Sequence, residues 1–461
     1  MRHLAAKAWY FFYFGSRSFI HPYLNLYFRR LGLNERAVGV LAGVKPWVSG
    51  PSRYLWATFA DKHRKHKLVL IGTLVVSVVC KTLIGASHAY WLLMVLVFIG
   101  EFFGAPNGTI ADAAVLASCK QWLVWKATSV GCGRLGINSF TMGALISRFG
   151  IEAPFVGFPI FSIFAIIAGF TLDMSLLTSP DDAQQGEEKK LSPDGLSDQN
   201  VPLLVESMDN SGMQDMHASA SDAENIGEDA LDGGKGSSKG RSNNSENAVA
   251  CSAKNGGDGN AGFFSKLRKV LSDPEVIIFL SMTFLMGIAS GAIESFLFLY
   301  LDQLGAPEYL MGLALLVTCS AEVPVFALMD RILRYVGVQT MLHIVMGVFI
   351  LRLLGYVMLA ALPSTWWVLA IEPLHGVTFG CAWGAGTEFS RRIAPPGLDA
   401  TLQAIFSGMY FGIGYGTGAV VGGALFNEFG PRIMYACVAM AVAVGWGMCL
   451  IAIRVLHGFR A

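Results

Sequence analysis

Apolar runs of about 20 residues alternate with short polar segments along most of this chain. At a rise of about 1.5 Å per residue, each run is long enough to cross a bilayer as an α-helix. Six runs precede the long polar stretch near the middle of the chain and six follow it, which predicts an all-α membrane protein with twelve transmembrane helices in two six-helix bundles. The predicted spans lie at about 8–28, 37–60, 68–87, 90–116, 124–147 and 153–176, and at about 274–301, 308–333, 338–361, 365–388, 400–426 and 431–456.

Residues 180–262 differ in composition, because Asp, Glu, Ser, Asn and Gly replace the apolar residues. Such a segment buries too little apolar surface to offset its loss of chain entropy, so we expect a disordered linker. The linker separates an N-terminal bundle at 1–179 from a C-terminal bundle at 263–461. The second bundle is predicted to begin with a short amphipathic helix on the membrane surface, formed by Phe263, Phe264, Leu267 and Val270 with Lys266, Arg268 and Lys269.

Composition agrees with a membrane protein and excludes an ordinary soluble domain. The chain is 53% hydrophobic and only 15% charged, whereas about a quarter of the residues in a soluble globular protein are charged. A net charge of +1 gives no indication of a nucleic-acid partner. The eight cysteines are scattered without the spacing of metal ligands, so we expect no metal site and no cofactor.

Basic residues in alternate loops predict the orientation in the membrane, because they are retained on the cytoplasmic side. We therefore place both termini and the linker in the cytoplasm, while the pattern leaves the plasma membrane and organelle membranes as alternatives. The loops assigned to the cytoplasm contain Lys62, Arg64, Lys65, Lys67, Lys120, Lys126, Arg331, Arg334, Arg391 and Arg392, and the opposite loops contain Arg29, Arg30, Arg36, Arg148 and Arg432.

The two halves resemble each other in sequence. Lys81 and Glu101 recur as Arg352 and Glu372 at an offset of 271, so a basic residue on the third helix of each half should face an acidic residue on the fourth. Duplicated halves place substrate and coupling sites at their interface. A chance coincidence of two short spacings is the alternative. Four further positions repeat at an offset of 273, with Tyr27, Leu31, Gly32 and Gly39 matching Tyr300, Leu304, Gly305 and Gly312.

Four ionisable side chains in the second half are the main candidates for a functional site. A charge at the bilayer centre costs on the order of 2.5 to 3.5 kcal/mol, so such groups normally pair and line a polar path. We expect Arg352 to pair with Glu372, and Glu322 to pair with His375. Pro373 should weaken the helix between Glu372 and His375. A static buried ion-pair network that only fixes helix packing is the alternative interpretation.

Other polar residues within the predicted spans are candidates for lining a cavity. Arg17, His21 and Asn25 occur at every fourth position of the first helix, and Glu294 occupies the position in the second half that matches His21. A packing role is the alternative for His21. The full set of candidates is Arg17, His21, Asn25, Lys45, Arg53, Lys81, Glu101, Asp112, Arg134 and Glu294.

The loop after the second predicted span contains an acidic residue followed by basic ones, which predicts a charged gate on the cytoplasmic face. It resembles the loop signature of the major facilitator superfamily, although Ala57 and Arg64 replace the usual glycines. Basic residues alone would also be expected as topology signals in any membrane protein. The gate candidates are Asp61, Lys62, Arg64 and Lys65, with Asp330 and Arg331 in the second half.

Within that superfamily the chain resembles the lactose permease and nucleoside:proton symporter branch, which includes animal major facilitator domain-containing proteins. The resemblance implies that Glu322 contacts substrate and takes part in proton coupling, and that Arg352, Glu372 and His375 complete the proton machinery. In the permease, however, the histidine precedes the glutamate, and its sugar-binding Glu/Arg pair has no obvious counterpart here, so a galactoside is not implied. The segments that carry the resemblance include Gly104-Ala105-Pro106, Ala111–Ala117, Ser320–Pro324, Leu374–Phe379 and Ala394-Pro395-Pro396 with Gln403.

These observations predict a secondary active transporter of a small polar organic solute, sugar-like or nucleoside-like, that is coupled to protons and works by alternating access. A transporter-like receptor or sensor without net transport is the alternative. An enzyme is not expected, because no nucleophile or second catalytic motif accompanies His375. The expected partners are the solute, a proton and the lipid bilayer, with no nucleic acid, and we expect a monomer.

Overall fold

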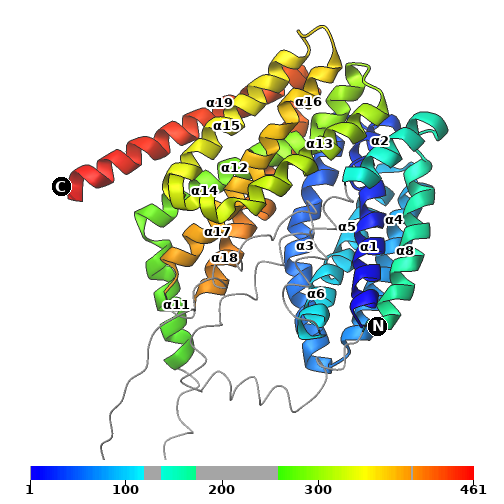
Figure 1. The fold of residues 1–461 in the computed structure, drawn as a ribbon, viewed down its shortest axis with the longest axis horizontal. Coiled ribbons are helices and arrows are strands. Elements are labelled where there is room, and N and C mark those ends of the chain that lie inside the picture. Colours follow the sequence, from blue (N-terminus) through cyan, green and yellow to red (C-terminus); the bar gives the residue numbers. More distant parts are fainter. Residues whose placement is uncertain (1, 119–135, 173–257, 396–397, 461) are drawn as a thin grey trace, which may run out of the picture.

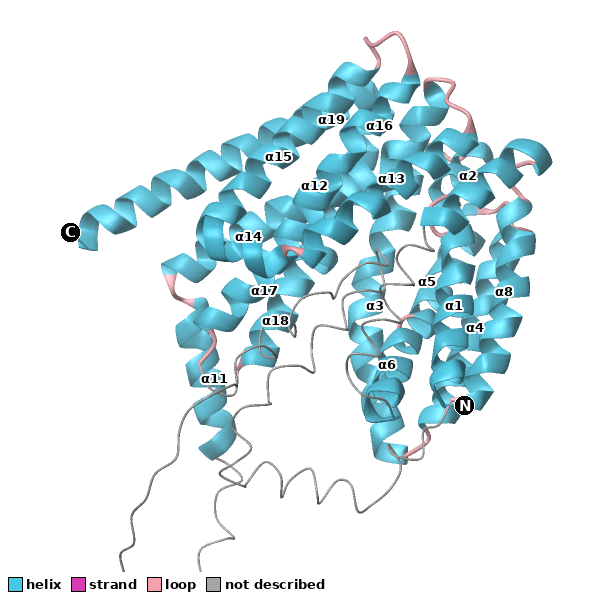
Figure 2. Cartoon of the chain, in the orientation of Figure 1, coloured by secondary structure: helices cyan, strands magenta, loops and turns pink. Residues whose placement is uncertain are grey.

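The computed structural model describes residues 2–118, 136–172, 258–395 and 398–460, and within them all regular structure is helical (Figures 1 and 2). Lys120, Lys126 and Arg134, and the predicted linker as far as residue 257, lie outside the described residues. Seven described helices are long and apolar enough to cross a membrane, and one of them, Asp399–Leu456, combines two predicted spans. The first, second and tenth predicted spans fall short because they are broken or carry charged residues, and the fifth lies partly outside the described residues.

The first half forms a bundle on the N-terminal side of the molecule, coloured blue to cyan in Figure 1. Its first predicted span is broken at His21–Tyr23, because Pro22 cannot donate the backbone hydrogen bond that a continuous helix requires. Its fourth span is divided in the same way before Pro106. The elements are α1 (Arg2–Ile20), α2 (Leu24–Arg30), α3 (Glu35–His63), α4 (His66–Ile84), α5 (Tyr90–Gly104), α6 (Pro106–Ser118), a helix at 136–149, and α8 (Ala153–Thr171).

The second half begins with α11 (Asp258–Leu271), which starts five residues before the predicted amphipathic segment. The tenth predicted span is broken into short pieces around Pro373, as that proline predicts. Gly430, at φ 79° and ψ 170°, separates the last two spans. The remaining elements are α12 (Pro274–Gln303), α13 (Glu308–Ala327), α14 (Met329–Val336), α15 (Val338–Leu359), η2 (Thr365–Trp367), α16 (Val368–Ile371), η3 (Glu372–Leu374), η4 (Gly376–Cys381), α17 (Ala382–Ile393), α18 (Asp399–Ser407), η5 (Gly408–Gly414) and α19 (Tyr415–Arg460).

The internal repeat predicted from the sequence is confirmed by local structure. The Tyr27 hydroxyl donates a hydrogen bond to the Gly85 carbonyl at 3.0 Å, and the Tyr300 hydroxyl donates one to the Tyr356 carbonyl at 3.1 Å. Both the tyrosines and their acceptors are related by the offsets found in the sequence. Gly32 and Gly305 both adopt positive φ, at 89° and 74°, in the turn that follows.

The two halves pack on each other through close backbone contacts at the second repeated glycine. A Cβ atom on Gly39 of α3 would lie 2.5 Å from the Ala419 carbonyl oxygen of α19, and one on Gly312 of α13 would lie 2.6 Å from the Ser139 carbonyl oxygen. Each half therefore uses the start of its second helix to contact the fifth helix of the other half.

The outer faces of the bundles are apolar, as a lipid environment requires. On α8, for example, Ile160, Ile163, Phe164 and Ile167 are between 47% and 56% exposed. Large side chains such as Trp9, Phe349 and Tyr435 are fully buried within the bundles.

Candidate functional site

A central cavity of about 170 Å³ lies between the two halves. Its walls come from α1, α2 and α3 of the first half and from α12, α13, α15, η3 and α19 of the second. The lining is unusually rich in ionisable groups for a membrane interior, with Arg17, His21, Lys45, Glu294, Glu322, Arg352, Glu372 and His375.

The predicted pairing of Arg352 with Glu372 is confirmed. Arg352 Nη2 lies 3.0 Å from Glu372 Oε2, and both side chains are almost completely buried. The Tyr356 hydroxyl accepts a hydrogen bond from Arg352 Nε at 2.9 Å and donates one to Glu372 Oε1 at 2.7 Å. Thr318 Oγ1 lies 2.7 Å from Glu372 Oε2. The carboxylate is thus held by a cation and two hydroxyl groups.

The predicted pairing of Glu322 with His375 is also confirmed, and the network fixes the tautomer of the histidine. Arg352 Nη1 lies 2.7 Å from His375 Nδ1. A guanidinium nitrogen can only donate, so Nδ1 must be the acceptor. The imidazole proton is therefore on Nε2, from which His375 donates to Glu322 Oε1 at 2.8 Å. The four side chains form one chain in the order Glu372, Arg352, His375, Glu322.

Irregular helix geometry positions this chain of side chains. Glu372 and His375 flank a 3₁₀ turn around Pro373, and i and i+3 side chains eclipse in such a turn. The next turn, η4 (Gly376–Cys381), is π-helical, a form that occurs mostly as single turns and frequently at functional sites. Gly376 lets this segment approach α13, because a Cβ atom there would lie 2.8 Å from the Ala321 carbonyl oxygen.

The first half contributes a cationic wall to the cavity. Arg17 and Lys45 are 9% and 6% exposed, and both interact electrostatically with His21. Arg17 Nη1 donates to the Tyr13 hydroxyl at 3.3 Å. The Nε2 atom of His21 has no hydrogen-bond partner among the described residues.

Charged side chains also join the two halves at the end of the molecule that carries α2. Arg30 Nη2 lies 2.7 Å from Asp302 Oδ1 and 2.8 Å from Glu308 Oε1. Ser147 Oγ donates to Glu308 Oε2 at 2.9 Å. In the first half Asn25 Nδ2 donates to the Ser295 carbonyl of the second at 3.1 Å. These contacts close the cavity at this end.

The model of the MFS_1 like family matches residues 3–437 of the chain. The chain belongs to this family. The predicted resemblance to the major facilitator superfamily is therefore confirmed, and membership supports a membrane transporter.

The chain is similar to the major facilitator superfamily domain-containing protein 6-like of Danio rerio. The two are 26% identical over 197 residues, which make up 42% of this chain and 35% of that protein. A maltose permease from Geobacillus stearothermophilus is 27% identical over 179 residues, or 39% of this chain and 45% of the permease. The matches thus span less than half of these relatives. The structure of the nucleoside transporter NupG covers 98% of both chains with a TM-score of 0.70 at 14% identity, which confirms the predicted fold class.

Several predicted cavity residues of this MFS_1 like protein lie elsewhere. Lys81 Nζ pairs with Glu101 Oε1 at 3.2 Å, which confirms that the ion pair is repeated in both halves. However, neither residue is among those that line the central cavity. Lys81 lines a smaller cavity with Ser77 and Asn107. Asp112 instead accepts a hydrogen bond from Tyr10.

Arg53 lies about two turns beyond Lys45 on α3 and is not among the described residues that line the central cavity. The other predicted lining residues of described segments, Arg17, His21, Asn25, Lys45 and Glu294, do line it.

The predicted cytoplasmic gate residues lie at the opposite end from Arg30. Asp61 pairs with His66 Nε2 at 2.8 Å. Lys62, Arg64 and Lys65 are exposed, and Arg64 ends α3 in the left-handed conformation at φ 52°. In the second half, Asp330 lies in the first turn of α14 and Arg331 is exposed. Among the residues that the structure describes, no ion pair joins the two halves at this end.

Sequence reasoning did not single out the residues that complete the network. Tyr356 lies four residues after Arg352 and Thr318 four residues before Glu322, so each shares a helical face with a charged residue. A hydroxyl residue four positions from an intramembrane charged residue was therefore the sequence feature that could have identified them.

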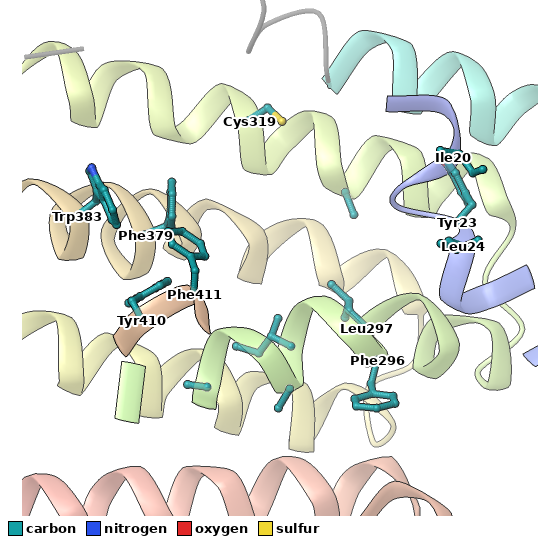
Figure 3. Close-up of a cluster of buried hydrophobic side chains, with 14 of the residues drawn as sticks. Ile20, Tyr23, Leu24, Phe296, Leu297, Cys319, Phe379, Trp383, Tyr410 and Phe411 are labelled. Carbon is teal, nitrogen blue, oxygen red and sulfur yellow. The ribbon is translucent and has the colours of Figure 1, made fainter. Parts of the chain in front are cut away.

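Trp383 and Tyr410 are buried and pack in an aromatic cluster of the second half. Trp383 and Phe411 have ring centroids 5.6 Å apart, and Tyr410 and Phe411 are 4.7 Å apart. Figure 3 shows these rings gathered beside Phe379, and none of the four is among the residues lining the central cavity. The rings of Phe379 and His375 stack with their centroids 5.3 Å apart, so the aromatic cluster packs against one face of the imidazole.

Proposed function

We propose that this protein is a secondary active transporter that couples movement of a small polar organic solute, sugar-like or nucleoside-like, to protons by alternating access. The observation that carries the proposal is the continuous chain from Glu372 through Arg352 and His375 to Glu322, which lines the cavity between the halves. Its members act as the coupling residues.

The charge of this network explains why a proton would be needed. Arg352 contributes one positive charge, while Glu322 and Glu372 contribute two negative charges and His375 is neutral in this geometry. Uptake of one proton therefore makes the network neutral. A neutral network is less costly to enclose in a low-dielectric interior than one with an excess charge. Protonation thus favours closure of the halves around the site.

Glu322 is the residue at which the proton enters. Its Oε2 atom has no hydrogen-bond partner among the described residues, whereas both oxygens of Glu372 are engaged. A proton from the cavity attaches to the Glu322 carboxylate without breaking any other hydrogen bond. Protonation of His375 on Nδ1 would instead require Arg352 Nη1 to move away, because two donors cannot share that contact.

The conformation corresponds to one half of the transport cycle. With both termini and the linker in the cytoplasm, Arg30, Asp302 and Glu308 lie on the external side and close it. The cavity then communicates with the cytoplasm, and the protein is inward-facing. The helix ends that carry Asp61 and Asp330 are proposed to meet when the cytoplasmic side closes.

The decisive experiment is a solute screen with purified protein in proteoliposomes under an imposed pH gradient. Accumulation above equilibrium that collapses with the gradient supports proton-coupled transport. Solute binding with no flux in any gradient would contradict transport and support the receptor alternative.

A further inference from the structure

The fixed charges of the central cavity are separated between its two walls. On the side of the first half, the cations Arg17, Lys45 and Lys81 interact electrostatically with one carboxylate, Glu101. That carboxylate pairs directly with Lys81 at 3.2 Å, which leaves Lys45, a residue that lines the cavity, without a carboxylate partner among the described residues. A buried excess of charge is destabilising unless another group compensates it.

Lys45 is the group that most clearly needs a ligand. It is 6% exposed and lines the cavity, and it makes no hydrogen bond or ion pair with any residue that the structure describes. It lies within α3, directly before Pro46. The adjacent His21 Nε2 atom also lacks a partner among the described side chains. The ammonium group of Lys45 and the Nε2 atom of His21 therefore lie beside the cavity without a hydrogen-bond partner among the described residues.

The opposite wall has the reverse charge. Glu294, Glu322 and Glu372 face a single cation, Arg352. Glu294 hydrogen-bonds to Tyr415 and is the carboxylate of this wall that has no basic partner in the described network. One wall of the cavity is thus cationic and the other is anionic.

We propose that the transported solute carries an anionic group, a carboxylate or a phosphate, that binds between Lys45 and Arg17 on the wall of the first half. This inference rests on the proposed function and deepens it by naming the substrate class. The rest of the solute faces the carboxylates of the second half and donates hydrogen bonds to Glu294.

The cavity limits the size of this solute. A water molecule needs roughly 15 Å³ of such space, so a cavity of about 170 Å³ holds on the order of ten water molecules. A solute with about that number of non-hydrogen atoms, such as a sugar acid or a polyol phosphate, matches both the volume and the charge.

The test compares matched neutral and anionic probes for binding to the purified full-length protein in detergent. The pairs are glucose with glucuronate, and glycerol with glycerol 3-phosphate, measured by isothermal titration calorimetry. The anion of at least one pair should bind about tenfold or more tightly than its neutral partner, since a hydrogen bond to a charged group is stronger than a neutral one. If both neutral probes bind as tightly as their anions, or if neither anion binds, the inference is wrong.

Variants identify the wall that binds the anion. Lys45→Gln should weaken anion binding about tenfold or more without weakening binding of the neutral probe, while Lys45→Arg should restore much of it. Lys67→Gln, at an exposed lysine on α4, is the matched control and should change neither. If Lys45→Gln does not fold, Arg17→Gln serves the same purpose. Unchanged anion binding in a folded variant of either residue would overturn the assignment.

Equilibrium binding needs no translocation, so this test is independent of the proposed function. Anions that bind through Lys45 but never accumulate would contradict transport and leave the inference standing. Accumulation of a neutral solute that is unaffected by Lys45→Gln would support transport and contradict the inference of an anionic solute.

Discussion

Gly39 and Gly312 occupy equivalent positions in the two halves, and each lies where its helix meets the backbone of the other half. The two contacts are on the same side of the molecule as the ion pairs of Arg30, because both glycines lie in the first two turns of their helices after the turn that follows α2 or α12. Small residues permit such close approach between membrane helices. On this side, the two halves are therefore held together by backbone packing as well as by ion pairs.

Gly39→Ala should favour the conformation that is open on this side. The added methyl group would meet the Ala419 carbonyl at 2.5 Å, and overpacking of this kind costs about 1 to 3 kcal/mol. Spin labels at the exposed positions Arg36 and Gln303 should report a longer distance in double electron–electron resonance. Gly72→Ala, at a site with no atom within 4 Å, is the control. An unchanged distance in Gly39→Ala would contradict this role.

Arg30→Ala should also favour the conformation that is open on this side, but by less than Gly39→Ala does. Its pairs with Asp302 and Glu308 are partly exposed, and such pairs contribute about 0.2 to 1 kcal/mol each. The Arg36 to Gln303 distance distribution should gain a longer component. Arg392→Ala, which removes an ion pair to Glu388 within one helix, should leave the distribution unchanged. Equal effects of the two variants would argue against a gate at Arg30.

Glu322→Gln should abolish accumulation of solute driven by a pH gradient and leave solute exchange without a gradient. The amide keeps the shape of the side chain and its contact with His375 Nε2, but it cannot take up the proton. Uptake and counterflow in proteoliposomes measure the two activities separately. Glu428→Gln, at an exposed position, is the control. Full accumulation in Glu322→Gln would contradict the coupling role.

The repeated ion pair of the first half should behave differently, because Lys81 and Glu101 lie outside the lining of the central cavity. Glu101→Gln leaves a buried lysine unpaired and should lower stability by about 3 to 5 kcal/mol. Lys81→Met combined with Glu101→Gln should regain much of that stability, since both charges are then absent. Thermal unfolding in detergent tests both variants. A double variant as unstable as the single one would show that the loss is not caused by the unpaired charge.

The matching double variant of the second half separates stability from coupling. Arg352→Met with Glu372→Gln should also be more stable than Glu372→Gln alone, for the same reason. It should nevertheless fail to accumulate solute, whereas Lys81→Met with Glu101→Gln should still accumulate it. Accumulation by both double variants would reduce the second network to a structural role.

The residues that could be predicted from the sequence are those whose partners follow from spacing. Apolar run length indicated the spans, and the internal repeat indicated that Lys81 faces Glu101 just as Arg352 faces Glu372. His375 follows Glu372 by three residues, which placed both on one face. Local periodicity carries this information directly.

The remaining features depend on how the halves pack. The contacts of Arg30 with Asp302 and Glu308 join residues more than 270 positions apart, and no local pattern specifies them. For the same reason the sequence could not show that Arg17 and Lys45 line the cavity while Lys81 does not. Pro22 could have predicted the break between α1 and α2, but the apolar residues around it favoured the prediction of a continuous span.

The π-helical turn at Gly376–Cys381 holds one residue more than an α-helical turn would. The extra residue adds almost no net rotation, because each residue of a π-turn advances the chain by less than the roughly 100° of an α-helix. Deleting one residue from the turn would therefore restore α-helical winding and leave α17 at nearly the same rotation relative to His375. Trp383 would then stay in its aromatic cluster. The same deletion within α17 would instead rotate every later residue of that helix by about 100°, so the turn should tolerate a one-residue deletion better than α17 does.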